Sequence, residues 1–215
     1  MHYKKRARSK AAKSERKDAI IVAAENLLRQ LGYDAMTMQA VAKEAGLGKG
    51  TLYLYFSNRE GLVLDVYERL YDAWIDQFAL QVSKVSGVEE FCRNFCDYYN
   101  NDPLFIKLTE FGLSHMEPQL DRGSYIKGKR AMASRVKKLA GIACQRLGIT
   151  PVLAHKFIWG LLTVASGATQ LSTRPSCFGE DFPEDVTSFI SSTNFETVFL
   201  NAAMPLCQVI MRVDE

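Results

Sequence analysis

Apolar side chains recur along most of this chain with the period of an α-helix. In the first strongly patterned stretch, Ile20, Ala24, Leu27 and Leu31 lie three or four positions apart and form one stripe. Gly32 follows this stripe, and glycine readily adopts the left-handed conformation that ends many helices. Similar stripes continue along the chain, and we find no convincing strand. The pattern predicts an all-α fold.

Residues 37–62 contain two short helical patterns separated by glycine. Thr37 is a suitable N-cap for the first helix, because its hydroxyl can accept from a free backbone N–H. Gly46 permits a tight turn, and the second helix is predicted from near Gly48 to near Phe56. Two helices joined in this way can place the second one in the major groove of DNA. The segment therefore predicts a helix-turn-helix.

The rest of the sequence predicts six more helical segments. Asn58, Asp102 and Thr150 are expected N-caps, and the last two are each followed by proline. A polar loop should fill residues 172–183, and Pro205 should kink or split the final segment. The segments are expected at about 59–78, 88–100, 103–114, 124–147, 151–171 and 184–213.

Polar residues on the second short helix indicate contact with nucleic acid. Lys49 can meet a phosphate or a guanine, and the hydroxyls of Thr51 and Tyr53 can donate to phosphates. Two glycines at the start of this helix would let its backbone N–H groups approach a phosphate. Core packing is the alternative for the aromatic residues, and we favour it for Phe56. The expected DNA-binding residues are Thr37, Gly48, Lys49, Gly50, Thr51, Tyr53, Tyr55 and Arg59.

Positive charge is concentrated at the N-terminus. Residues 1–17 contain eight lysines or arginines and one glutamate, so they carry +7 against a total of +3, and the remainder carries −4. A basic arm on a mildly acidic body suggests a polyanionic partner at one end of the chain. A solvated, disordered tail is the alternative. The neighbouring helix-turn-helix favours nucleic acid.

Residues 15–65 resemble the TetR family of transcriptional regulators, which are mostly repressors. The remainder is similar only in length and helical character. Three positions depart from the family pattern: Gly48 where serine or threonine is frequent, Leu54 where tyrosine is common, and Arg59 where lysine is usual. The matching residues are Thr37-Met38, Val41-Ala42, Ala45-Gly46, Lys49-Gly50-Thr51-Leu52-Tyr53, Tyr55-Phe56 and Arg59-Glu60-x-Leu62.

The resemblance implies a homodimer that binds an inverted-repeat operator on double-stranded DNA, with the arm adding phosphate or minor-groove contacts. It also implies a small-molecule effector, which we expect to be hydrophobic or amphipathic and whose binding would release the repressor. We therefore expect a basic arm at 1–17, a DNA-binding domain of three helices at 18–62 and an effector-binding and dimerisation domain at 63–215.

Apolar and small residues of the C-terminal part are candidates for these two roles, although core packing is the alternative for each. The candidates for the effector site are Trp74, Phe78, Phe95, Tyr98, Phe105, Phe111, Tyr125 and Trp159. The candidates for a dimer interface are Gly160, Val164, Gly167, Ala168, Phe195 and Phe199.

Other classes of function find little support. His115-x-Glu117 lacks a following Cys-x-x-Cys, and no nucleophile elbow or P-loop is present, so we expect no catalysis, cofactor or metal. We expect a cytoplasmic protein without a membrane partner, whose five cysteines are reduced; Cys92 and Cys96 should pack as small apolar residues. A sequence-independent, architectural DNA-binding protein without a ligand switch is the alternative to a regulator.

Overall fold

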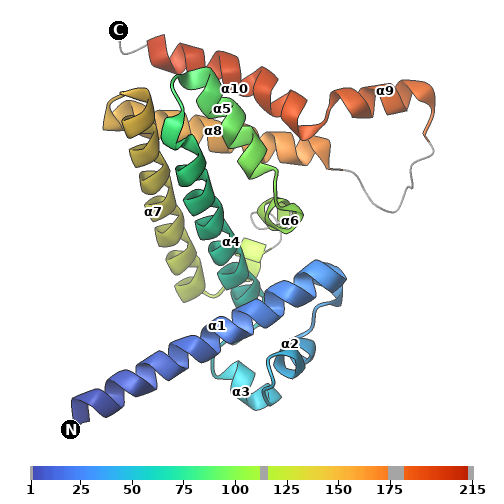
Figure 1. Cartoon of the computed structure of the whole chain (residues 1–215). Coiled ribbons are helices and arrows are strands. Elements are labelled where there is room, and N and C mark those ends of the chain that lie inside the picture. The colour runs from blue at the N-terminus through green and yellow to red at the C-terminus, as the bar shows by residue number, and fades with distance from the viewer. Residues whose placement is uncertain (1, 112–115, 174–181, 213–215) are drawn as a thin grey trace. The chain divides into compact units, whose positions relative to one another are not determined.

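The computed structural model describes residues 2–111, 116–173 and 182–212, and for residues 2–10 it describes the backbone alone. Ten α-helices and no strand are present in these ranges, which confirms the predicted all-α fold (Figure 1). The helices are α1 (His2–Ala35), α2 (Met38–Glu44), α3 (Lys49–Tyr53), α4 (Arg59–Gln81), α5 (Val88–Tyr99), α6 (Pro103–Phe111), α7 (Arg122–Leu147), α8 (Pro151–Ser172), α9 (Glu184–Ser192) and α10 (Phe195–Arg212).

The helices form two compact units. The first consists of Met1–Leu70 and Gly112–Gly128, and the second of Tyr71–Phe111 and Lys129–Glu215. Both α4 and α7 contribute residues to each unit. The predicted functional division between residues 62 and 63 stays a prediction.

The first unit contains α1, α2, α3 and the start of α4. Gly32 interrupts the helical backbone of α1 with φ of 76°, as its position after the apolar stripe predicted. Ile20, Val41 and Leu52 are fully buried and join α1, α2 and α3 in one core. The Asn58 side chain accepts from the backbone N–H of Gly61 at 2.9 Å, which caps the start of α4.

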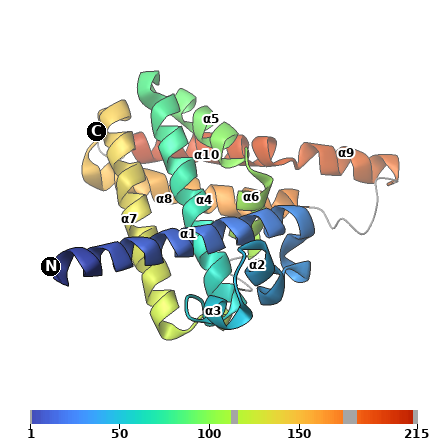
Figure 2. The same ribbon diagram turned by 60° about the horizontal axis from the view of Figure 1, so that its bottom comes forward.

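The expected N-terminal arm is helical. α1 begins at His2, so residues 2–17 continue the same helix whose apolar stripe begins at Ile20. Figure 2 shows this helix extending past the turn that links α2 to α3 within the first unit. Lys13, Arg16 and Lys17 therefore lie on a helix rather than in an extended tail.

In the second unit, α8 packs against α10 and α5, and α5 packs against α10. Two of the predicted caps start helices here: Asp102 accepts from the backbone N–H of Leu104 at 2.9 Å, and Thr150 from that of Leu153 at 3.3 Å. α9 contains no buried residue, so it contributes nothing to the core.

The last helical region is divided, but not where we predicted. The break lies between α9 and α10, at Thr193 and Asn194, and the helix continues through Pro205. Asn194 accepts from the backbone N–H of Thr197 at 3.0 Å and so begins α10 as an N-cap. A split at Pro205 was therefore wrong. The predicted end of the 103–114 segment and most of the 172–183 loop lie outside the described residues.

Candidate nucleic-acid interface

α2 and α3 lie side by side and form the helix-turn-helix. The Thr37 hydroxyl accepts from the backbone N–H of Ala40 at 3.1 Å, which confirms Thr37 as the N-cap of α2. Gly46 has φ of 65°, a conformation that favours glycine, and it turns the chain after α2. The backbone N–H of Leu47 donates to the carbonyl of Ala42 at 2.8 Å and closes the turn.

α3 turns one face to the core and the other to solvent. Leu52 is fully buried and Phe56 is 6% exposed, so both anchor the helix, and the preference for core packing of Phe56 is confirmed. Tyr53 is 44% exposed and Lys49 is also exposed. The polar groups that we expect to contact DNA therefore project from a fixed scaffold.

The start of α3 carries no side-chain cap, because its N-cap is Gly48. A Cβ added at Gly50 would meet nothing within 4 Å, so the surface there is open. This arrangement leaves room for a phosphate near the backbone, although contact at either glycine stays a prediction.

Tyr55 lies beyond α3. The helix ends at Tyr53, with Leu54 as its C-cap, and does not continue to Phe56 as predicted. Tyr55 is half-buried, and the Lys13 ammonium lies 6.0 Å from the centre of its ring. Contact of Tyr55 with DNA stays a prediction, and it would compete with this contact to α1.

Arg59 is held by groups of its own unit. Its guanidinium lies 4.0 Å from the ring centre of Tyr33, and it donates to the Tyr33 carbonyl at 3.4 Å. Glu60 approaches Arg59 at 3.4 Å and accepts from the Tyr33 hydroxyl at 3.2 Å. Burial raises the pKa of Tyr33, against the lowering effect of the Arg59 charge. Arg59 thus joins the end of α1 to the start of α4, a role that the sequence analysis missed.

A buried carboxylate connects the basic helix to two other helices of the first unit. Asp65 on α4 is 8% exposed and pairs with Lys17 of α1 and Lys127 of α7. Lys127 also lies 3.3 Å from Glu68. Burial lowers the pKa of Lys127, but its bonds to Asp65 and Glu68 outweigh this and leave the pKa raised. No local sequence pattern predicts this network, because its members lie far apart along the chain.

Four of the eight predicted effector-site residues form a buried aromatic cluster in the second unit: Trp74, Phe78, Phe95 and Phe105. Ring centres of Trp74 and Phe78 lie 5.6 Å apart in a stacked arrangement, and Phe105 stacks on Trp74 at 5.9 Å. Phe95 meets the edge of Trp74 at 5.3 Å. These rings pack against one another, as the core alternative predicted.

The other four candidates are more exposed than the cluster, although the ring of Tyr98 meets that of Phe78 with centres 6.5 Å apart. Tyr98 and Phe111 are half-buried, whereas Tyr125 is 43% exposed and Trp159 is 44% exposed. Tyr125 belongs to the first unit, whereas the aromatic cluster belongs to the second. An effector site at these four residues stays a prediction.

Polar groups accompany the aromatic cluster. Trp74 Nε1 is buried and has no hydrogen-bond partner among the residues that the structure describes. Burial raises the pKa of Tyr99, against the lowering effect of hydrogen bonds with Thr109, Thr169 and Ser166. The interior of the second unit thus holds the indole donor of Trp74, which was predicted as an effector-site residue, and several hydroxyl groups that were not predicted as part of that site.

Most of the predicted dimer residues lie inside the second unit of a single chain. Phe195, Phe199 and Ala168 are at most 6% exposed. A Cβ at Gly160 would lie 3.2 Å from Leu206, so this glycine lets α8 approach α10. For these four residues the structure supports the alternative, in which the helices close the core of one chain. Val164 is half-buried, and Gly167 is exposed with open space around it.

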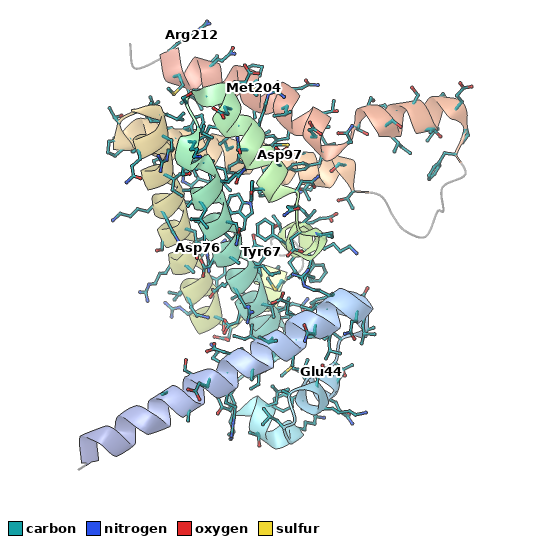
Figure 3. The ribbon with its side chains drawn as sticks, viewed as in Figure 1. Glu44, Tyr67, Asp76, Asp97, Met204 and Arg212 are labelled. Carbon is teal, nitrogen blue, oxygen red and sulfur yellow. The ribbon has the colours of Figure 1, made fainter. Side chains whose placement is uncertain are left out.

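The outer faces of the same two helices expose apolar side chains. Trp159 on α8 is 44% exposed, and Leu206 and Val209 on α10 are 36% and 58% exposed. An open groove of about 560 Å³ also crosses α10 beside α5, and Met204 in its lining is labelled in Figure 3. The groove is lined by Arg93, Asn194, Glu196, Thr197, Leu200, Asn201, Met204 and Pro205, none of which we predicted as a site residue.

No group of three or more histidine, cysteine, aspartate or glutamate residues that could hold a metal occurs within the described part of the chain. No single helix there is long and apolar enough to cross a membrane, although α7 and α8, bent by 114°, meet the length and composition criteria as a pair.

A short helix that presents lysine and tyrosine after a glycine turn, beside a basic helix, defines a helix-turn-helix DNA-binding protein. Residues 20–66 match the family of bacterial regulatory proteins described as the tetR family. Residues 68–203, more than half of the chain, match the tetracyclin repressor-like C-terminal domain. The chain therefore belongs to the TetR family of transcriptional regulators, which is not a family of enzymes.

Curated relatives match between about a quarter and a half of this chain. The chain is 45% identical over 56 residues to the uncharacterized HTH-type transcriptional regulator YhgD of Bacillus subtilis (strain 168), which covers 26% of this chain and 29% of YhgD. It is 28% identical over 71 residues to the Fatty acid metabolism regulator protein of the same organism, covering 33% and 37%. The chain thus matches well under half the length of these relatives.

Solved structures are similar over most of the chain. FadR of Thermus thermophilus, a TetR family repressor in complex with lauroyl-CoA, has a TM-score of 0.56 and 15% identity and covers 89% of this chain and 93% of its own. A possible TetR family regulator from Streptomyces coelicolor A3(2) has a TM-score of 0.59 and 16% identity, and the match covers 92% of this chain and 99% of that one. The multidrug binding protein EbrR, complexed with imidazole, has a TM-score of 0.55 and 15% identity, and the match covers 83% of this chain and 94% of that one. At such identities the likeness shows the fold alone.

Proposed function

We propose that this TetR-family regulator is a homodimeric repressor that binds an inverted-repeat operator and leaves it when a small hydrophobic or amphipathic effector binds. The observation that carries the proposal is the outward face of α3. Lys49 and Tyr53 are exposed there while Leu52 anchors the helix from below. Side chains held in this way can read base edges, and one α3 from each subunit would enter successive major grooves.

The basic part of α1 would strengthen binding through phosphates. Lysine and arginine residues that neutralise phosphates release counterions, so the affinity should fall steeply with salt. Of the arm residues whose contacts are described, Lys17 pairs with Asp65 and Lys13 lies against Tyr55, so these two also fix the helix to its unit. The remaining cations of residues 1–17 are our candidates for phosphate contacts.

The second unit would bind the effector near the aromatic cluster. Trp74 Nε1, buried without a partner among the described residues, would donate to an oxygen of the effector, since an unpaired buried donor is costly. The rings around Trp74 would contact its apolar part. FadR of Thermus thermophilus binds lauroyl-CoA, which combines both kinds of group, and this supports an amphipathic effector here. Binding must favour one conformation of the dimer to release DNA.

Selection of bound sequences from a random double-stranded DNA pool tests the DNA-binding part of the proposal. The purified protein at physiological salt should enrich an inverted repeat with half-sites about one helical turn apart. Lys49→Ala should enrich it less strongly, whereas Lys84→Ala, a change to a lysine of the second unit, should enrich it as the wild type does. Equal binding to all sequences would reject the regulator and favour the architectural alternative.

Lauroyl-CoA is a suitable first probe for the effector. The chain has two tryptophans, so Trp159→Phe leaves Trp74 as the single indole fluorophore. Lauroyl-CoA should change the fluorescence of this variant and release the selected operator in a mobility-shift assay. CoA without an acyl chain is the control and should do neither. A saturable fluorescence change without release would contradict the proposed switch.

A further inference from the structure

Leu54 is the most exposed large apolar side chain in the part of the chain that the structure describes, at 79%. It directly follows α3, and its backbone angles (φ −73°, ψ −18°) remain helical, so it continues the last turn of the helix. Leu54 is also one of the positions at which this chain departs from the family pattern, in which tyrosine is common.

Helix geometry places Leu54 in the middle of the outward face. With about 100° between successive residues, Leu54 lies about 200° around the axis from Leu52, which is fully buried. It lies one turn beyond Gly50, which has no side chain and is surrounded by open space. Along the centre of this face, Leu54 is therefore the side chain that projects.

We infer that Leu54 reads a thymine in each half-site by packing against its 5-methyl group. The inference rests on the proposed function, because it requires that α3 enters the major groove. The thymine methyl is the apolar group that base edges present in that groove, and leucine has no donor or acceptor for the other groups. Lys49 and Tyr53 carry the polar groups of this face, and Leu54 adds an apolar side chain that discriminates for the methyl group.

Deoxyribose is the other apolar surface of DNA that Leu54 could touch. A sugar contact would be present whatever the base, whereas a contact to thymine depends on one methyl group at one position. Replacement of thymine by deoxyuridine removes that methyl and leaves pairing and sugar unchanged. This replacement therefore distinguishes a contact with the thymine methyl from a contact with the sugar.

The test measures dissociation constants for the selected operator with deoxyuridine placed at each thymine in turn. For the wild-type protein, one position in each half-site should weaken binding about fourfold, the value expected for one buried methyl group. Leu54→Ala removes this contact from both subunits of the dimer, so it should bind the unmodified operator about as weakly as the wild type binds an operator with deoxyuridine at that position in both half-sites, a loss of about sixteenfold. It should also show no further loss when the same thymine becomes deoxyuridine.

Leu31→Ala is the matched control, because Leu31 is also exposed, at 51%, in the first unit. This variant should keep the full sensitivity to deoxyuridine. Two outcomes would overturn the inference and leave the proposed function intact. In one, wild type and Leu54→Ala are equally sensitive to deoxyuridine at every position. In the other, Leu54→Ala binds more weakly although the wild type is sensitive at no position. Loss of all sequence preference in the wild type would instead reject the proposed function, and the inference with it.

Discussion

At the scale of single residues, Lys49 and Arg59 differ in what surrounds them although both were predicted to bind DNA. Lys49 is exposed, and no contact of its side chain with another group is described. The Arg59 guanidinium stacks on Tyr33 and pairs with Glu60. A substitution at Lys49 should therefore change the affinity for DNA and leave the stability of the fold unchanged. A substitution at Arg59 should mainly lower the stability of the fold.

Lys49→Ala should weaken operator binding about tenfold at physiological salt, because each subunit loses one contact with a phosphate or base. If the partner is a phosphate, the slope of log affinity against log salt should fall by about 0.9 for each lost contact, or about 2 for a dimer. Fluorescence anisotropy over a salt series measures both quantities. Thermal unfolding should be unchanged, and an unchanged operator affinity would show that Lys49 does not face DNA.

Arg59→Ala should lower the free energy of unfolding by about 1 kcal/mol, the value of a partly exposed cation–π contact with its associated hydrogen bonds. Urea denaturation measures the loss. A double-mutant cycle with Tyr33→Leu tests the cause, since the two losses should be less than additive if the residues act on each other. Strict additivity would assign the Arg59 effect to another contact.

The cysteines should differ in reactivity according to burial. Cys92, Cys96 and Cys207 are buried, as the sequence predicted for Cys92 and Cys96. Burial raises the pKa of Cys96 to about 12, and hydrogen bonding with Cys92, together with burial, raises that of Cys207. A raised pKa keeps a thiol protonated near neutral pH, and the thiolate is the nucleophile.

Iodoacetamide at pH 8 should therefore modify the half-exposed Cys144 well before the three buried thiols. Peptide mapping by mass spectrometry at successive times gives the order. Labelling of all cysteines at one rate in urea is the control for intrinsic reactivity. Early modification of Cys96 in the native protein would contradict its burial. Cys177 lies outside the described residues.

At the scale of helices, local sequence signals correctly predicted where several helices begin. Features that depend on packing between residues far apart in the chain were not predicted. Thr37, Asn58 and Thr150 were identified as N-caps because a cap acts within three residues of itself. The pairing of Asp65 with Lys127 joins residues on two separate helices, and no periodicity reports on it. The early end of α3 was missed for the same reason, since Phe56 turns into the core beyond it.

Pro205 shows that a breaker residue need not break a helix that packs well. α10 continues through it because buried neighbours such as Phe199, Ala203 and Cys207 hold the helix on both sides. The proline still removes one backbone N–H and crowds the preceding turn. Packing therefore offsets a local cost that the sequence analysis read as a break.

Pro205→Ala should consequently raise the free energy of unfolding by about 1 kcal/mol or more, towards the roughly 3 kcal/mol that separates proline from alanine inside a helix. Pro205 is exposed, so little packing is lost with its ring. Ala202→Gly, at another exposed position of α10, is the control with opposite sign and should cost about 1 kcal/mol. A less stable Pro205→Ala would mean that α10 requires the bend that proline imposes.

At the scale of the whole molecule, helical periodicity shows which face of a helix is apolar but not whether its own chain or a second copy covers that face. Phe199 and Trp159 were both assigned roles outside the core. Phe199 is fully buried in the second unit, whereas Trp159 remains 44% exposed. The packing of α8, α5 and α10 is what distinguishes the buried Phe199 from the exposed Trp159. We therefore now expect the dimer interface on the outer faces of α8 and α10.

Val209 should lie in that interface, because it is 58% exposed on α10, in the same outer set as Leu206 and Trp159. Val209→Asp would bury an unpaired charge between subunits, and the dimer should dissociate at micromolar concentrations where the wild type remains a dimer. Sedimentation velocity measures this. Leu80→Asp, at a 71% exposed position of α4, should leave the dimer intact.

The same two variants connect assembly with DNA binding. An inverted repeat is bound tightly because one subunit holds the other close to its half-site, so a monomer should bind the full operator hardly better than a single half-site. Val209→Asp should lose the affinity difference between these two DNAs, and Leu80→Asp should keep it. If Val209→Asp remained a dimer with full operator affinity, the subunits would meet on another face, and the exposed apolar residues of α8 and α10 would need a different partner.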